Sequence, residues 1–273
     1  VAASPIEGQG ASRPDGQFTL TNRLRTVEFL TNMSCGVNTC GRQVFCLPFS
    51  SNIGVRIKAA TLGQVPPQAR MVSGPSPFDG IVDYTGNSFD GNADGIATGP
   101  GTDDFSWRFQ TTDRPNLQPP RISAVRPGIR ASNVAVDVHV QSDFDSALQA
   151  STVSSDTVRL RTNEPSELAD TFWWTVGVTP LRQDGGVAQP GDQARRSRIE
   201  LDHRPYSPVQ ETPEGILAPQ YAPYVQSEVQ NIYQNCFNPA SSLSCVGNRY
   251  CCDDRPSATA CAIPRPLEII PRS

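Results

Sequence analysis

The sequence predicts an all-β protein of two tandem sandwich domains, followed by a small disulfide-rich C-terminal segment. Three observations predict it. Pro (25 residues) and Gly (21) are abundant in a chain of 273 residues, and both favour turns over helix interiors. Short apolar runs recur along the chain, with turn residues between them. Eight cysteines fall into an early and a late group. The length is that of two ordinary domains, and 37% hydrophobic residues are enough for a core.

The first half contains runs in which apolar and polar residues alternate. The sequence Val55 to Lys58 has this pattern, and Phe105, Trp107 and Phe109 fall on one face of another run. We predict strands over residues 18–20, 24–30, 43–47, 53–59, 81–84 and 105–109. The intervening residues 63–80 are rich in Pro and Gly, so they predict a surface loop.

A proline-rich connector over residues 112–120 predicts a domain boundary. Beyond it, the short-strand pattern returns, and two sandwiches follow from that spacing. We predict strands over residues 121–125, 134–140, 157–161, 171–178 and 198–201. The predicted organisation is an extended N-terminal segment (1–17), a first domain (18–114), a second domain (115–235) and a cystine-rich segment (236–273). The last is too short to have its own core.

An aromatic and proline-rich stretch closes the second domain. It contains Tyr206, Tyr221, Tyr224 and Tyr233, with five prolines between residues 205 and 223. Two interpretations stay open: the stretch lies across a subunit interface, or it covers its own domain.

Charge and hydropathy exclude two classes of partner. The chain has 23 basic and 27 acidic residues, a net charge of -4, and no long basic run, so we expect no nucleic-acid partner. No segment approaches the roughly 18 consecutive apolar residues that a membrane span requires. We therefore expect no membrane span.

The cysteines predict disulfides. The early group is Cys35, Cys40 and Cys46, and the late group is Cys236, Cys245, Cys251, Cys252 and Cys261. Neither group contains a C-x-x-C pair or a histidine, so zinc is disfavoured. Disulfides indicate an oxidising compartment. Because both groups are odd in number, either an odd number of bridges joins them, or each group keeps one cysteine for another chain.

The sharpest local motif is Asp90-Gly91-Asn92-Ala93-Asp94-Gly95, the D-x-N-x-D-G opening of a calcium loop. Asp90, Asn92 and Asp94 are the candidate calcium ligands. Gly101 occupies the twelfth position, where an EF-hand has a bidentate Glu. A carboxylate from elsewhere would have to substitute, and the candidates are Asp79, Asp83, Asp103 and Asp104. The alternative is an Asx- and Gly-rich hairpin that binds no metal.

Catalytic residues are not predicted. His139 and His203 lie near no Ser or Cys nucleophile motif, so we expect that the protein is not an enzyme. Trp173 and Trp174 would point to opposite faces of a strand. An exposed Trp there could bind sugar rings or a partner protein, while the other could be a core residue.

Both halves carry a degenerate pattern that resembles a known family. In the second half the pattern runs through residues 120–127, 134–140, Phe144, Leu148 and 151–160. In the first half it runs through residues 13–16, 45–48, 87–95 and 105–109. These stretches resemble bacterial immunoglobulin-like (Ig-like) domains of the S-layer (SbsA) type, in two tandem copies.

The resemblance implies a structural role outside the cell or on the bacterial cell surface. Such domains build stalks, S-layers and filaments, so the implied partners are like subunits or other cell-surface proteins. The alternative function is a carbohydrate-binding or adhesive surface module, which would recognise glycans through an exposed Trp and calcium.

Overall fold

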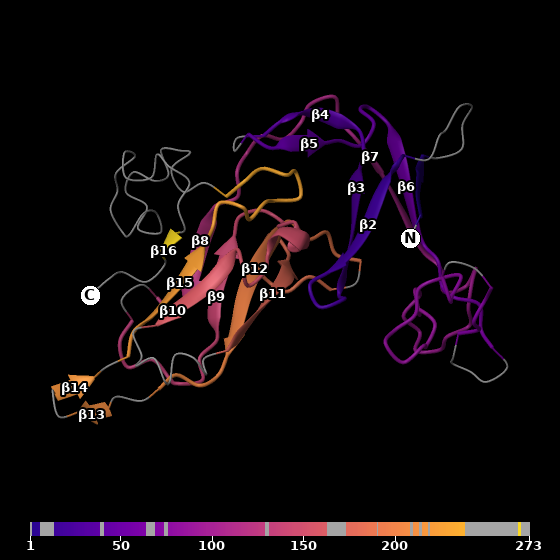
Figure 1. Ribbon diagram of the computed structural model, residues 1–273. Coiled ribbons are helices and arrows are strands. Elements are labelled where there is room, and N and C mark those ends of the chain that lie inside the picture. Colours follow the sequence, from indigo (N-terminus) through magenta and orange to yellow (C-terminus); the bar gives the residue numbers. More distant parts are fainter. Residues whose placement is uncertain are drawn as a thin grey trace. The chain divides into compact units, whose positions relative to one another are not determined.

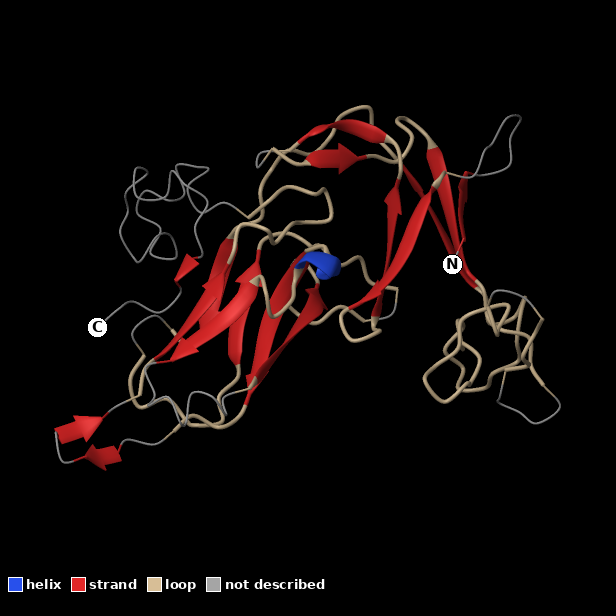
Figure 2. Cartoon of the chain, in the orientation of Figure 1, coloured by secondary structure: helices blue, strands red, loops and turns tan. Residues whose placement is uncertain are grey.

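The computed structural model is nearly all β, which confirms the predicted fold class at this level (Figure 2). The structure describes residues 2–5, 14–38, 41–63, 69–73, 76–128, 131–162, 173–189, 191–207, 210–212, 215–217, 219–237 and 267–268. Within these ranges the single helical element is a 3-10 turn at Ala150–Thr152. No helix in the described part of the chain is long and apolar enough to cross a membrane.

The strands are short and form small sheets (Figure 1). Their bounds are β1 Ala2–Pro5, β2 Gly16–Thr21, β3 Thr26–Thr31, β4 Ser34–Val37, β5 Gln43–Phe45, β6 Asn52–Ile57, β7 Phe105–Gln110, β8 Ile122–Arg126, β9 Val140–Phe144, β10 Val158–Thr162, β11 Trp174–Leu181, β12 Arg196–His203, β13 Gln210–Thr212, β14 Gly215–Leu217, β15 Tyr221–Val225 and β16 Leu267–Glu268. The sheet orders are β1-β6-β7, β11-β12-β9-β8 and β10-β15-β16, with the two-stranded sheets β2-β3, β4-β5 and β13-β14.

The chain divides into two compact units that are not contiguous in sequence. The first comprises Val1–Phe18, Phe29–Cys35 and Phe45–Pro115. The second comprises Thr19–Glu28, Gly36–Val44 and Asn116–Ser273. Two short segments of the N-terminal part therefore belong to the second unit.

The first unit contains the antiparallel sheet β1-β6-β7. Alternation in β6 directs Ile53, which is fully buried, to the same face as Val55 and Ile57. β1, in the predicted extended segment 1–17, pairs with β6 of its own chain.

The described residues of the second unit form a hydrophobic core, to which its two larger sheets both contribute. Strand β12 buries Ser197, Ile199 and Leu201 at alternate positions, and β10 buries Val158 and Leu160. The core is completed by Ile122, Val140, Phe144, Leu148, Tyr221, Val225, Val229 and Phe237. All these side chains form one cluster, so the sheets β11-β12-β9-β8 and β10-β15-β16 are stabilised together.

The turn between β2 and β3 packs on the edge strand β11 within the second unit. The side chain of Asn22 donates to the Val178 carbonyl (2.7 Å) and accepts from the Val178 N–H (2.9 Å). The adjacent Arg23 forms an ion pair with Asp202 (3.3 Å) and also bonds the hydroxyl of Thr175. These contacts hold residues 19–28 in that unit.

Two predicted strands are wrong. Residues 134–140 form a turn through Val136 and Asp137, and only Val140 enters β9. The Val136 carbonyl accepts from the N–H of Tyr206 (2.7 Å), so this segment is bonded to the chain after β12 rather than to a neighbouring strand. Residues 81–84 make only isolated bridges at Ile81 and Val82, because the chain turns immediately afterwards.

The described residues 219–225 of the aromatic and proline-rich stretch pack on their own domain. Residues Tyr221–Val225 form β15, which pairs with β10 and places Pro223 opposite Leu160. Tyr221 and Tyr224 are buried there. The backbone pairs despite the proline, whose missing N–H made a strand unexpected.

Candidate functional site

The predicted calcium loop is a tight turn in the long connection between β6 and β7. The N–H of Gly95 donates to Asp90 Oδ2 (2.8 Å), and the N–H of Asp94 donates to Asn92 Oδ1 (3.0 Å). Asn92 Nδ2 in turn donates to Asp94 Oδ2 (3.0 Å). Gly95 has φ +83° and Ala93 φ +58°, so the bend uses the left-handed region twice. The three candidate ligands therefore lie close together.

One oxygen of this loop is buried and unpaired. Asp90 Oδ1 is inaccessible to solvent and has no hydrogen-bond partner among the described residues. A buried carboxylate oxygen without a donor is costly, and a cation would remove that cost. Asp90 Oδ1 is therefore the oxygen of this loop that best suits a hard cation. Asp94 Oδ1, by contrast, accepts a hydrogen bond from the N–H of Ile96 (2.8 Å).

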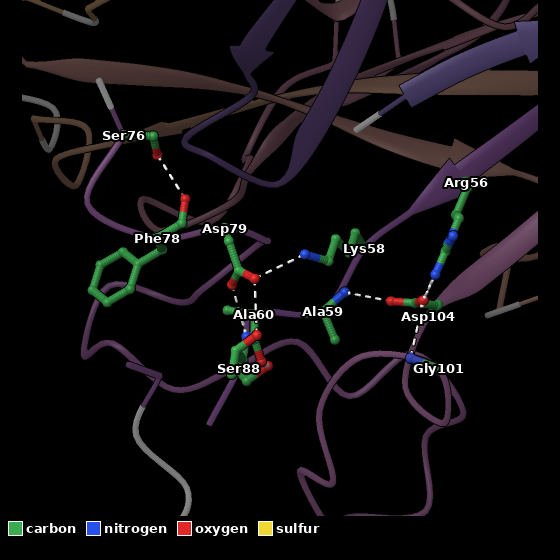
Figure 3. Close-up of polar contacts among 11 residues, drawn as sticks. Arg56, Lys58, Ala59, Ala60, Ser76, Phe78, Asp79, Ser88, Gly101 and Asp104 are labelled. Carbon is green, nitrogen blue, oxygen red and sulfur yellow. Dashed lines mark hydrogen bonds and ion pairs between the residues drawn. The ribbon is translucent and has the colours of Figure 1, made fainter. Parts of the chain in front are cut away.

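Asp79 and Asp104, two of the predicted substitute ligands, are bonded to protein donors (Figure 3). Asp79 accepts from Lys58 Nζ (2.8 Å) and from the N–H and hydroxyl of Thr61 (both 2.8 Å). Asp104 accepts from Arg56 Nε (3.0 Å) and from the N–H of Ala59 (2.8 Å). The hydrogen bond from Lys58, together with those from Thr61, holds the pKa of Asp79 well below its usual range.

Asp103 and Asp83, the other two substitutes, are also bonded to the protein. Asp103 is fully buried and accepts from the N–H groups of Thr98 (2.5 Å) and Gly99 (2.8 Å). Burial raises the pKa of Asp103, but these bonds outweigh it and lower the pKa overall. Asp83 accepts from the side chain and N–H of Asn87 (both 2.8 Å), and with Thr85 these bonds lower its pKa to about 2.

These four carboxylates organise the described residues between 58 and 104 by accepting hydrogen bonds from N–H groups of the loops. Among the described carboxylate oxygens of this region, Asp90 Oδ1 is the one that is buried without a donor, so it is the strongest candidate contact for a cation. Among the residues that the structure describes, no group of three or more His, Cys, Asp or Glu side chains could hold a metal ion. The bonds of Asp79 and Asp104 to Lys58, Thr61, Arg56 and Ala59 were missed from sequence because they join residues 18 to 48 positions apart.

The two adjacent tryptophans lie in different environments in the second unit. Trp173 is 54% exposed, whereas Trp174 is half-buried and packs against the core cluster. Trp173 is therefore an aromatic surface that a ligand can reach. The residues immediately before it, 163–172, lie outside the described ranges.

Three of the eight cysteines lie in the described part of the chain. Cys35 and Cys46 form a disulfide, and Cys236 is also disulfide-bonded. Cys236 Sγ lies 3.6 Å from Asn38 Nδ2. The remaining predicted disulfide residues, Cys40, Cys245, Cys251, Cys252 and Cys261, lie outside the described residues.

Comparison with known proteins gives no family. A scan against protein-family models found no match, and a search of curated proteins found no significant relative.

Proposed function

We propose that the protein is a non-catalytic structural protein, located outside the cell or on the bacterial cell surface. In this role it is a building block of a stalk, S-layer or filament, assembled with like subunits or other surface proteins through two Ig-like domains. The proposal is supported most directly by the architecture: a chain that is nearly all β, with small antiparallel sheets of which the two larger ones of the second unit share a core.

The Cys35–Cys46 disulfide supports the location. Disulfides persist in oxidising compartments and are rare in the reducing cytosol. A surface protein also benefits from a covalent link within a small sheet region, because small sheets bury little apolar area.

Electron microscopy of the purified full chain, together with its mass in solution, tests this function. Ordered filaments or arrays, or a stable complex with surface proteins, are the expected result. The proposal would be contradicted by a chain that stays strictly monomeric at all concentrations, forms no array and binds to no cell surface.

An adhesive or carbohydrate-binding role is the second candidate, and Trp173 favours it. An exposed indole provides a flat apolar surface on which sugar rings can stack. A glycan array with wild type and Trp173→Ala tests this, with Tyr84→Ala as a control because Tyr84 is also highly exposed. Loss of signal in the Trp173 variant alone is expected, and no glycan signal for wild type removes the idea.

Calcium is proposed as the cation for the Asp90 loop in this second role. Addition of about 1 mM Ca²⁺ is expected to raise the unfolding temperature, as for weak extracellular calcium sites. Asp90→Asn should abolish the rise, while Asp113→Asn, at an exposed loop aspartate, should retain it. A rise of equal size in both variants would show that the loop is not the site.

A further inference from the structure

Strand β7 forms an edge of the sheet β1-β6-β7 and pairs with β6 on one side only. On its other side, no described segment forms a backbone hydrogen bond with it. All six of its residues, Phe105–Gln110, are exposed. It contains no Pro, and Arg108 is its one charged residue, so it has little of the protection that sheet edges commonly carry.

One face of this edge strand is aromatic. Phe105, Trp107 and Phe109 alternate along β7 and are 39%, 42% and 38% exposed. They stand opposite Ile57, Val55 and Ile53 of β6, so the six side chains share one apolar face. The rings of Phe105 and Trp107 are in contact, with centroids 5.6 Å apart.

The same chain protects another edge. In the second unit, the Asn22 side chain bonds both the N–H and the carbonyl of Val178 on the edge strand β11. No comparable cap lies on β7 in the described residues. This difference indicates that the unpaired edge of β7 can accept a partner strand.

The sequence of β7 identifies the partner. Residues 105–109 read Phe-Ser-Trp-Arg-Phe, and the aromatic positions are the same when the segment is read backwards. Antiparallel pairing of two identical strands around a twofold axis at Trp107 places Phe105 opposite Phe109 of the second copy and Trp107 opposite its own copy. We propose that β7 pairs in this way with β7 of a second copy, which joins two three-stranded sheets into one.

Charge supports this register. With the axis at Trp107, Arg108 faces Ser106 of the second copy, and no like charges oppose each other along residues 105–109. With the axis one residue later, the two Arg108 side chains would face each other, which is unfavourable. The Trp107 register also keeps all aromatic pairs on one face, where they stabilise cross-strand pairing.

This interface rests on the proposed structural function and supplies its like-subunit contact. Its first test is the mass of the full chain by light scattering between about 1 and 100 µM, a range in which weak and moderate dimers dissociate. Wild type should approach twice the mass of one chain. Trp107→Lys should weaken dimerisation at least tenfold, whereas Trp173→Lys, the same change at a similarly exposed Trp, should not.

A cross-linking test reads the register directly and requires a folded interface. Trp107→Cys places two thiols at the axis, where facing residues of antiparallel strands are about 4.5–5.5 Å apart at Cα, within disulfide range. Oxidised glutathione takes up the two electrons, and both thiols lose their protons as the S–S bond forms. Peptide mapping should find residue 107 linked to residue 107. Arg108→Cys should give little link, because its two copies lie about 8 Å apart.

Three outcomes overturn the interface: a monomer at every concentration, a dimer that Trp107→Lys leaves intact, or equal cross-linking at residues 107 and 108. A monomer whose glycan binding is lost in Trp107→Lys would assign the aromatic face to a sugar instead. Filaments that persist in Trp107→Lys would remove this interface but leave the proposed function standing. The absence of dimers, filaments and arrays, together with no binding to a cell surface, would remove both.

Discussion

At the scale of single residues, Asn22 acts as a substitute for a strand residue. Its side-chain amide offers one donor and one acceptor, and both bond to Val178 on the edge of β11 as a neighbouring peptide group would. Asn22 has φ +50°, a conformation that Asn tolerates better than most residues. Asn22 thus both adopts the left-handed conformation that the turn requires and hydrogen-bonds the exposed edge of β11.

We predict that Asn22→Ala destabilises the protein by about 1–3 kcal/mol, because Val178 loses its donor and its acceptor at once. Asn22→Gly separates the two effects, since Gly accepts the positive φ but makes no bond. Urea unfolding should rank wild type above Gly, and Gly above Ala. If the Gly variant is as stable as wild type, the amide contributes nothing.

Leu24 is the least favourable residue of the same turn. It has φ +66° and its side chain is largely exposed, so it incurs the cost of a left-handed conformation without burying apolar surface. Leu24→Gly should stabilise the protein by about 1 kcal/mol in urea unfolding. Leu20→Gly, at an exposed strand position of β2, should destabilise it. Equal losses in both variants would contradict the argument.

At the scale of elements, the described residues between 58 and 104 are organised by carboxylates more than by strands. Asp79 and Asp104 bond to the segment that follows β6, and Asp83 and Asp103 close turns further along. All four have pKa values below the usual range. Their ionised forms are therefore the ones that the fold stabilises.

This network predicts acid sensitivity of the first unit. A carboxyl whose pKa is lowered by folding stabilises the protein above its unfolded pKa, about 4, and the stabilisation is lost as pH falls through the folded pKa. For Asp83 the folded value is about 2. The unfolding temperature should therefore fall between about pH 4 and pH 2. Trp107 fluorescence, in a Trp173→Phe/Trp174→Phe background, reports this unit alone.

Asp83→Asn should be less stable than wild type at pH 7 and lose less stability on acidification. Asp113→Asn, at an exposed loop position, serves as the matched control and should keep the wild-type pH profile. An unchanged profile in Asp83→Asn would show that this carboxyl does not carry the effect.

The sequence predicted those strands that can be recognised from the alternation of apolar and polar residues within the strand itself. Strands β6 and β7 follow from Val55, Ile57 and the aromatic positions of β7, because a period of two is readable without knowing the neighbour. Residues 134–140 have the same period, yet they form a turn that is hydrogen-bonded to the chain after β12. The sequence of residues 134–140 alone does not reveal this distant partner. The contacts of Asp104 with Arg56 and Ala59 likewise depend on a distant segment, whereas those of Asp103 are local.

At the scale of the whole molecule, the two units share the N-terminal part of the chain. Segments Thr19–Glu28 and Gly36–Val44 belong to the second unit, while the residues between and around them belong to the first. The single boundary near Pro115 that the sequence predicts does not include these two segments in the second unit. The order of strands and linkers along the chain gives no sign that they belong there. A fragment that starts at Asn116 would lack Asn22 and Arg23, which bond to β11 and β12.

In the second unit, Asn38, which lies between the early cysteines Cys35 and Cys40 in sequence, contacts the late cysteine Cys236. Asn38 Nδ2 lies 2.6 Å from the carbonyl of Gln234 and 3.6 Å from Cys236 Sγ, and Cys236 is disulfide-bonded. The Cys35–Cys46 bridge uses two of the three early cysteines, so Cys40 is the one whose partner decides between an internal link and a link to another chain. Cys40 lies two residues after Asn38 in sequence.

We therefore predict that Cys40 is linked to Cys236 of the same chain. Non-reducing peptide mapping should find a Cys35–Cys46 peptide and a Cys40–Cys236 peptide, and a denaturing non-reducing gel should show a single-chain mass even where β7 pairs two copies. The last four cysteines are then even in number and can pair among themselves. Two results would contradict the prediction. A Cys40 peptide linked to another chain would make assembly covalent, and Cys40 recovered as a free thiol would leave Cys236 bonded to a cysteine of the C-terminal segment.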